Sequence, residues 1–145
     1  ARLLMLGEGP DREKLEQLVN TLNLGDSVQL PGFATNPYAY MSRSAAFVLS
    51  SIWEGLPTVL MEALCCGAPI VSTDCPSGPR EILNHGEYGR LVPMRDEAAL
   101  AEAMIAALDG KIDRPSSASW KRYTLDVVVE QYLDVLLSEP AATSV

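Results

Sequence analysis

The sequence is poor in the residues that build metal sites and disulfide frameworks. Its 145 residues include one histidine and three cysteines, with no metal-ligand spacing among them. Cys65 and Cys66 are adjacent and Cys75 stands alone, so no disulfide pattern is present. Such thiols are typical of small, buried or half-buried residues in a reducing compartment. We therefore expect a cytoplasmic protein.

Positive charge is also scarce, and long apolar runs are missing. Eleven Lys and Arg against nineteen Asp and Glu give a formal net charge of −8. Because nucleic acids and anionic lipids are bound by clustered Lys and Arg, we expect neither as a direct partner of the chain. No apolar run approaches the ~18 residues that span a bilayer, so direct membrane insertion is not expected. The apolar stretch at residues 3–6 reaches a glycine too soon for a signal peptide.

Apolar residues are plentiful, at 48 %, which supports a packed core in a chain long enough for one compact domain. Short apolar runs alternate with helical patterns, which is typical of an α/β fold with a parallel sheet covered by helices on both faces. The expected strands are residues 3–6, 28–30, 46–50, 70–73 and 89–92. The expected helices are residues 11–24, 36–42, 59–66, 80–83, 96–108 and about 120–137. We expect one domain over residues 1–138 and a flexible tail at residues 139–145.

The segment from Ser50 to Gly67 places two carboxylates eight positions apart. Glu54 lies in a Gly-Pro turn, and Glu62 lies inside the helix that follows. With Thr58 as N-cap and Gly67 just past the end, this helix is expected over residues 59–66. Its first turn exposes unpaired backbone N–H groups and carries partial positive charge, which suits an anion such as phosphate.

Glu62 is about one turn into that helix, and helical side chains lean toward the N-terminus. Its carboxylate is therefore expected close enough to a bound phosphate to accept hydrogen bonds from neighbouring hydroxyl groups. Phosphates together with hydroxyls describe a nucleotide sugar. The same segment is also compatible with an ordinary strand, turn and helix, in which Glu54 is solvated and Glu62 is an exposed helix residue.

Five stretches of the chain resemble, in family order, the C-terminal half of retaining glycosyltransferases of the GT-B fold. This is the large glycogen-synthase-like family, the glycosyl transferases group 1. The stretches are Leu6-Gly7-Glu8-Gly9-Pro10, Pro31-Gly32-Phe33, the run from Ser50 through Glu62, Gly67 to Asp74, and Gly78-Pro79-Arg80-Glu81-Ile82-Leu83. The match covers Leu3 to about Leu108. It implies a Rossmann-like, nucleotide-sugar-binding domain.

The resemblance implies a role for each glutamate. Glu62 would hydrogen-bond the nucleotide ribose, and Glu54, the candidate catalytic residue, would lie beside the donor sugar and position its hydroxyls. The backbone N–H groups that would hold the diphosphate are those around Gly55, Leu56, Thr58 and Val59.

Other matching segments imply the rest of the donor site. The loop containing Gly7 and Gly9 would close on the donor, and Phe33 belongs to a segment that would flank the base through its backbone. Residues 74–82 are most similar to members that use UDP-linked hexoses or N-acetylhexosamines. The implied reaction is sugar transfer with retained anomeric configuration, to a glycan or lipid-linked acceptor. No cofactor and no metal are implied, since the chain has no Asp-x-Asp pair.

The family's catalytic unit has two Rossmann-like halves, and only the second is matched here. The acceptor-binding N-terminal half is missing. So is the first, central strand of the donor half, which would lie between residues 3–6 and 46–50. The chain is therefore expected to be a fragment of a larger enzyme and inactive alone. The sequence leaves open whether that enzyme is peripheral at the inner membrane face. In the family the terminal helix often crosses back to the other half, so an exposed apolar face is expected here at Trp120, Tyr123, Val127, Val128 and Leu136.

Three rival interpretations stay open. A dinucleotide-binding dehydrogenase would need Gly-x-Gly-x-x-Gly, but the third position here is Arg12 and no acidic residue ends the second strand. A non-catalytic nucleotide-binding or interaction module could keep the fold and lose the chemistry. A UDP-sugar epimerase of GT-B architecture would lack the paired glutamates. Two further charged residues are interpreted separately. His85 is interpreted as a loop residue rather than a base, and Arg80 as a partner of either a phosphate or a carboxylate.

Overall fold

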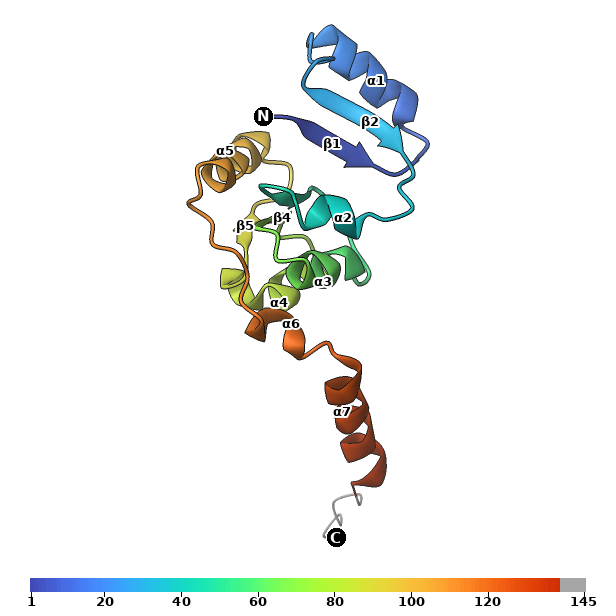
Figure 1. Cartoon of the computed structure of the whole chain (residues 1–145), viewed down its shortest axis with the longest axis vertical. Helices are drawn as coiled ribbons and strands as arrows, with labels where there is room; N and C mark the ends of the chain where they lie inside the picture. Colours follow the sequence, from blue (N-terminus) through green and yellow to red (C-terminus); the bar gives the residue numbers. More distant parts are fainter. Residues whose placement is uncertain (139–145) are drawn as a thin grey trace. The chain divides into compact units, whose positions relative to one another are not determined.

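The computed structural model describes residues 1–138, which group into two compact units, residues 1–40 and the residues from Met41 onward (Figure 1). The sequence predicted one domain over this range. The residues group into two units because their strands form two separate sheets, with no hydrogen-bonded pair linking one sheet to the other. The predicted tail at residues 139–145 lies outside the described residues.

The first unit is a β-α-β arrangement. Strand β1 (Leu3–Leu6) is followed by helix α1 (Arg12–Thr21) and strand β2 (Val28–Gly32), and the two strands pair in parallel. The register of this strand pair aligns Leu3 with Val28 and shifts between Leu4 and Leu6. The apolar residues of α1 are at best half-buried, so this unit contributes little core of its own.

The second unit contains a three-stranded parallel sheet in the order β3-β4-β5. Its strands are β3 (Phe47–Leu49), β4 (Ile70–Thr73) and β5 (Arg90–Val92). Its helices are α3 (Thr58–Cys65), α4 (Pro79–Ile82), a 3₁₀ turn (Asn84–Gly86), α5 (Glu97–Leu108), α6 (Ala118–Lys121) and α7 (Leu125–Leu137), and the short helix α2 (Tyr38–Met41) lies at the junction of the two units.

The central strand β4 is buried over its whole length, and its alternating side chains serve two cores. Ile70 belongs to a cluster with residues of α3 and α4, including Leu60 and Leu64. Its neighbour Val71 belongs to a second cluster with Val92 and two alanines of α5. Helices therefore cover both faces of this sheet, which confirms the predicted α/β class.

Each sheet has an edge strand with a single partner. Within residues 1–138, β1 pairs only with β2, and β3 pairs only with β4. These are the two strands between which the sequence predicted a missing central strand. Because β2 and β5 also have a single partner each, the strand pairing of residues 1–138 does not by itself locate the missing strand.

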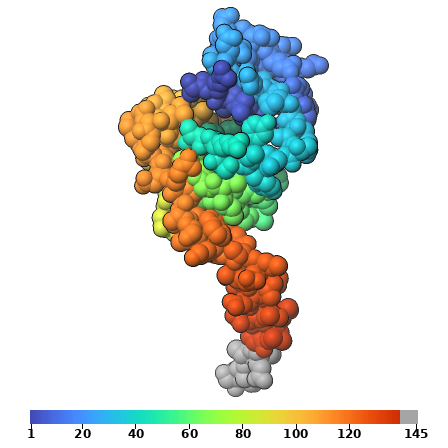
Figure 2. All heavy atoms as spheres, in the orientation of Figure 1, coloured from blue at the N-terminus to red at the C-terminus, as the bar shows by residue number. Residues whose placement is uncertain are grey.

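The C-terminal segment differs from its prediction at two aromatic residues. Trp120 and Tyr123 are half-buried and pack against the core cluster that contains Leu60, rather than forming an exposed face. Leu136 is 73 % exposed, as expected, whereas Val127 and Val128 are half-buried. Most other apolar side chains of α7 are exposed. In Figure 2 the atoms of α7, coloured orange-red, lie at the surface along the helix. Among the described residues, no helix is long and apolar enough to cross a membrane.

Helix α5 begins at a side-chain cap, as predicted. The carboxylate of Asp96 accepts a hydrogen bond from the N–H of Ala99 at 2.9 Å. Because this bond satisfies an otherwise unpaired N–H, Asp96→Ala is expected to lower the free energy of unfolding by about 1 kcal/mol. Urea denaturation compared with Asp96→Asn, which keeps a capping oxygen, measures the difference. Equal losses in the two variants would contradict the capping role.

Candidate functional site

Glu54 is held by the carboxyl ends of two strands. The Ser51 hydroxyl donates a hydrogen bond to Glu54 Oε1 at 2.6 Å, and the hydroxyl of Thr73, the last residue of β4, donates to the Ser51 carbonyl at 2.5 Å. The Glu54 side chain is half-buried. Since carboxyl ends of parallel strands are where ligands bind in open α/β sheets, Glu54 occupies a position suited to substrate.

Helix α3 begins one residue earlier than predicted, at Thr58. Thr58 as N-cap is wrong, because Pro57 occupies the cap position and no side chain caps this helix. Pro57, with φ −74° and ψ 77°, forms an inverse γ-turn in which the Thr58 N–H donates to the Leu56 carbonyl at 2.8 Å. At the other end, Gly67 has φ +68°, so the predicted C-terminal glycine is confirmed.

This local geometry changes which N–H groups are open at the start of α3. The N–H of Thr58 is used in the γ-turn, and that of Leu60 bonds to the Pro57 carbonyl at 2.9 Å. Within residues 1–138 the N–H groups of Leu56 and Val59 meet no hydrogen-bond acceptor. The partial positive charge of the helix start is therefore presented by these two positions, together with the exposed Gly55 before them.

Glu62 is half-buried in the middle of α3, and its charge acts on neighbouring thiols. Burial raises the pKa of the Cys65 thiol, and the Glu62 carboxylate raises it further. Burial likewise raises the pKa of Cys75, and the Glu54 carboxylate adds to that shift. Both thiols are therefore neutral near pH 7, and the buried Cys75 is a neighbour of Glu54.

The remaining predicted site residues, Gly7, Gly9 and Phe33, belong to the first unit. Phe33 is 81 % exposed, and Gly7 has φ +111°, a backbone conformation that favours glycine. The loop between β1 and α1 lines a hollow of about 270 Å³. The nine predicted residues thus form two groups, six around the start of α3 in the second unit and three in the first.

Arg12, in α1, forms hydrogen bonds to the loop between β1 and α1 and to strand β2. Its guanidinium donates to Glu8 Oε1 at 2.6 Å, to Glu16 Oε1 at 2.8 Å and to the Leu30 carbonyl of β2 at 2.7 Å. The Glu8 bond raises the pKa of Arg12. A dinucleotide-binding fold needs a glycine at this position so that helix and strand can approach closely, so the bulky Arg12 argues against that rival.

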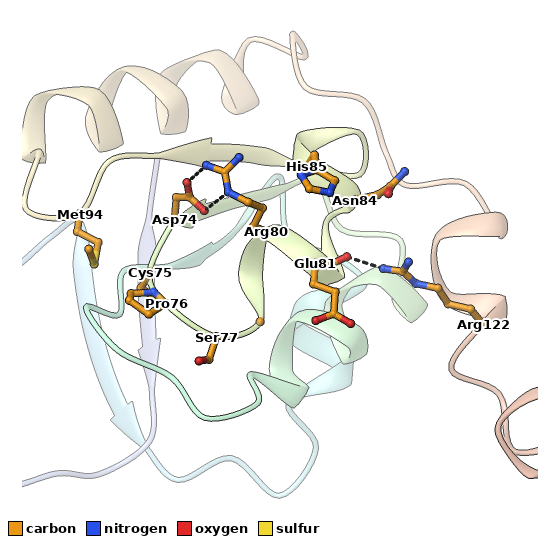
Figure 3. Close-up of a pocket in the computed structure, with 11 residues that line it drawn as sticks. Asp74, Cys75, Pro76, Ser77, Arg80, Glu81, Asn84, His85, Met94 and Arg122 are labelled. Atoms are coloured by element: carbon orange, nitrogen blue, oxygen red, sulfur yellow. Dashed lines mark hydrogen bonds and ion pairs between the residues drawn. The ribbon is translucent and has the colours of Figure 1, made fainter. Parts of the chain in front are cut away.

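A larger hollow, of about 600 Å³, lies in the second unit and was missed from the sequence (Figure 3). Figure 3 shows the Arg80 guanidinium paired with the Asp74 carboxylate. Of the two partners that the sequence left open for Arg80, a phosphate or a carboxylate, the structure contains the carboxylate. His85 is exposed in a loop with φ +56°, which fits the loop interpretation. The signal that could have found this hollow is the run Ser77-Gly78-Pro79, which begins four residues after β4 ends.

The chain was compared with known proteins. The profile of the family described as Glycosyl transferases group 1 matches residues 1–126. The chain belongs to this family. The segments that carried the resemblance in the sequence therefore lie within a matched range, and the fold is that of the C-terminal domain of a GT-B glycosyltransferase.

Two relatives illustrate the glycosyl transferases group 1 family, one uncharacterized and one named for its activity. The chain is 49 % identical over 83 residues to an uncharacterized glycosyltransferase of Methanocaldococcus jannaschii, covering 57 % of this chain and 20 % of that protein. It is 38 % identical over 108 residues to N-acetylgalactosamine-N,N'-diacetylbacillosaminyl-diphospho-undecaprenol 4-alpha-N-acetylgalactosaminyltransferase of Campylobacter jejuni, covering 74 % of this chain and 30 % of that protein. The chain thus spans less than a third of these two relatives.

Solved structures agree on the fold. Anabaena HepE in complex with UDP and glucose matches with a TM-score of 0.81 at 20 % identity, over 93 % of this chain and 40 % of that chain. At this identity the likeness concerns the fold. It places residues of both units within one known architecture.

Proposed function

We propose that this chain is the nucleotide-sugar-binding half of a retaining glycosyltransferase that uses a UDP-linked hexose or N-acetylhexosamine. The observation that carries the proposal is the start of α3, where two open N–H groups lie in the stretch that separates Glu54 from Glu62. The names of two relatives support the substrate class, since one transfers N-acetylgalactosamine and another was solved with UDP and glucose. The acceptor, a glycan or lipid-linked sugar, would be held mainly by an N-terminal half.

Each group has a separate task in this proposal. The Leu56 and Val59 N–H groups and the dipole of α3 bind the diphosphate, whose negative charge grows as the bond to the sugar breaks. The Glu62 carboxylate accepts hydrogen bonds from the ribose hydroxyls. Glu54, fixed in place by the Ser51 hydroxyl, accepts hydrogen bonds from hydroxyls of the donor sugar.

The acceptor hydroxyl then attacks on the face that the diphosphate leaves, through an oxocarbenium-like state, and the departing diphosphate takes the proton. Glycosidase carboxylates act as acid and nucleophile only where both flank one glycosidic bond. Here one carboxylate is assigned to the ribose, so the pair is not given those roles. We further propose that the transfer needs no metal ion, which retention of activity in excess EDTA would test on the whole enzyme.

The division of labour between the two glutamates is testable on Glu54. Glu54→Ala is expected to leave UDP affinity within about twofold of the parent chain, because Glu54 contacts only the sugar. The same variant is expected to weaken UDP-N-acetylglucosamine by about tenfold, the loss of one charge-assisted hydrogen bond. Calorimetric titration with both ligands measures the difference.

The control is Glu102→Ala, which removes an exposed carboxylate on α5. It should leave both affinities unchanged. If Glu54→Ala weakened UDP and UDP-N-acetylglucosamine equally, the assignment of Glu54 to the donor sugar would be refuted.

A further inference from the structure

The hollow of about 600 Å³ lies entirely within the second unit, at the carboxyl ends of β4 and β5. Asp74 and Cys75 follow directly after β4, and Met94 comes two residues after β5. Carboxyl ends of neighbouring parallel strands form the ligand-binding edge of open α/β sheets. A hollow of this size fits a ligand of one or two sugar rings.

The side chains that line this hollow carry charges of both signs. The charged side chains that line it are Arg80, Arg122, Asp74 and Glu81, so the formal charges of the four cancel. Arg80 is largely exposed in its pair with Asp74, and Arg122 donates to the Glu81 carbonyl at 2.7 Å (Figure 3). A phosphate site would carry net positive charge, so this lining does not favour an anion. Paired donors and acceptors suit the hydroxyl groups of a neutral sugar.

Several residues that line the hollow have unusual backbone conformations. Three non-glycine residues that line the hollow, Ser77, Asn84 and His85, have φ of +64°, +46° and +56°. Such conformations cost of order 1–3 kcal/mol each and cluster at ligand sites. Arg122 adds a buried Nε atom without a hydrogen-bond partner in residues 1–138. The wall of the hollow therefore combines backbone strain with one unpaired donor, which is itself buried.

This hollow adjoins the proposed donor site. Gly78, in its wall, packs so closely on Pro57 that a Cβ at Gly78 would lie 2.4 Å from Pro57 Cδ. Pro57 is the residue that begins the turn into α3. The pKa of Cys75, which also lines the hollow, is raised by burial and by the charge of the Glu54 carboxylate. Two wall residues of the hollow, Cys75 and Gly78, are thus close to the segment that holds Glu54 and the start of α3.

We propose that the hollow bounded by Asp74, Ser77, Arg80, Glu81 and Arg122 binds a neutral saccharide and forms a subsite for the acceptor glycan. The binding of a saccharide stands on this geometry alone. Its role as acceptor subsite rests on the proposed function, because a donor must be bound next to it.

The test is a titration of the ¹⁵N-labelled full chain with three neutral disaccharides, namely N,N′-diacetylchitobiose, lactose and maltose. At least one is expected to shift the backbone amide signals of Ser77, Arg80 and Glu81, with an affinity in the millimolar range. Arg80→Met should weaken that binding about tenfold, and the exposed Glu81→Gln several-fold, because each removes a charge-assisted hydrogen bond. Arg90→Met, an exposed change on β5 outside the hollow, is the matched control and should bind as the parent chain does.

Three results would overturn the proposal. They are the absence of shifts at these amides with all three sugars up to tens of millimolar, equal weakening by Arg80→Met and Arg90→Met, and a stronger response of the same amides to inorganic diphosphate. UDP added to the same sample separates the two hypotheses. UDP shifts at α3 without any saccharide response refute the subsite alone, whereas saccharide binding without a UDP response refutes the proposed function and leaves a sugar site.

Discussion

Glu62→Ala is expected to weaken UDP binding by about 1–3 kcal/mol, or roughly 5- to 150-fold, in a calorimetric titration. The carboxylate of Glu62 is half-buried on α3, and in our account it accepts hydrogen bonds from both ribose hydroxyls. Its removal leaves those hydroxyls without their partner in a partly desolvated place. The loss of a negative charge near the diphosphate acts in the opposite direction, but across about one helical turn and in solvent this gain is smaller.

Two further variants make the Glu62 result specific. Glu62→Gln keeps an acceptor oxygen without the charge and should lose less affinity than Glu62→Ala. Glu102→Ala removes an exposed carboxylate from another helix and should bind UDP as the parent chain does. An unchanged UDP affinity in Glu62→Ala would refute the assignment of Glu62 to the ribose.

Gly78→Ala is expected to destabilise the second unit by about 3 kcal/mol, since it combines backbone strain with overpacking. Gly78 has φ +117°, a conformation that L residues rarely adopt. A Cβ there would lie 2.4 Å from Pro57 Cδ and 2.9 Å from Pro57 Cγ, and the proline ring cannot rotate away. Because Pro57 is buried, relief requires movement of the turn that begins α3. UDP affinity should therefore fall together with stability.

Urea unfolding followed by tryptophan fluorescence measures the Gly78 effect, because Trp120 packs against the core of this unit. The matched control is Gly55→Ala. At Gly55 an added Cβ meets no atom within 4 Å, and φ lies outside the left-handed region. This control should stay within about 0.5 kcal/mol of the parent. A Gly78→Ala chain as stable as Gly55→Ala would show that the contact with Pro57 is loose in solution.

Much of the fold followed from short-range signals in the sequence. The strands Leu3–Leu6 and Ile70–Thr73 match their predicted bounds, because each is an apolar or β-branched run closed by polar or turn residues. Gly67 was predicted as the end of α3 because a left-handed residue commonly ends a helix. The start of α3 was placed one residue late, since a proline γ-turn replaces the side-chain cap that Thr58 suggested.

Features that depend on long-range contacts could not be predicted in this way. Arg122, for example, donates to carbonyls about 40 positions earlier in the chain. Trp120 and Tyr123 were expected to be exposed because the terminal helix of the family often crosses back to the other half. Their burial depends on where α6 lies against the cluster around Leu60.

The central claim is that the start of α3 holds the diphosphate of a nucleotide whose ribose is bound by Glu62. A pair of titrations of the ¹⁵N-labelled chain, one with UDP and one with uridine, tests it most directly. UDP is expected to shift the backbone amide signals of Leu56 and Val59, whose N–H groups are open, and uridine to shift signals near Glu62 while leaving those two in place. Equal responses of Leu56 and Val59 to both ligands, or a UDP response confined to other parts of the chain, would contradict the claim.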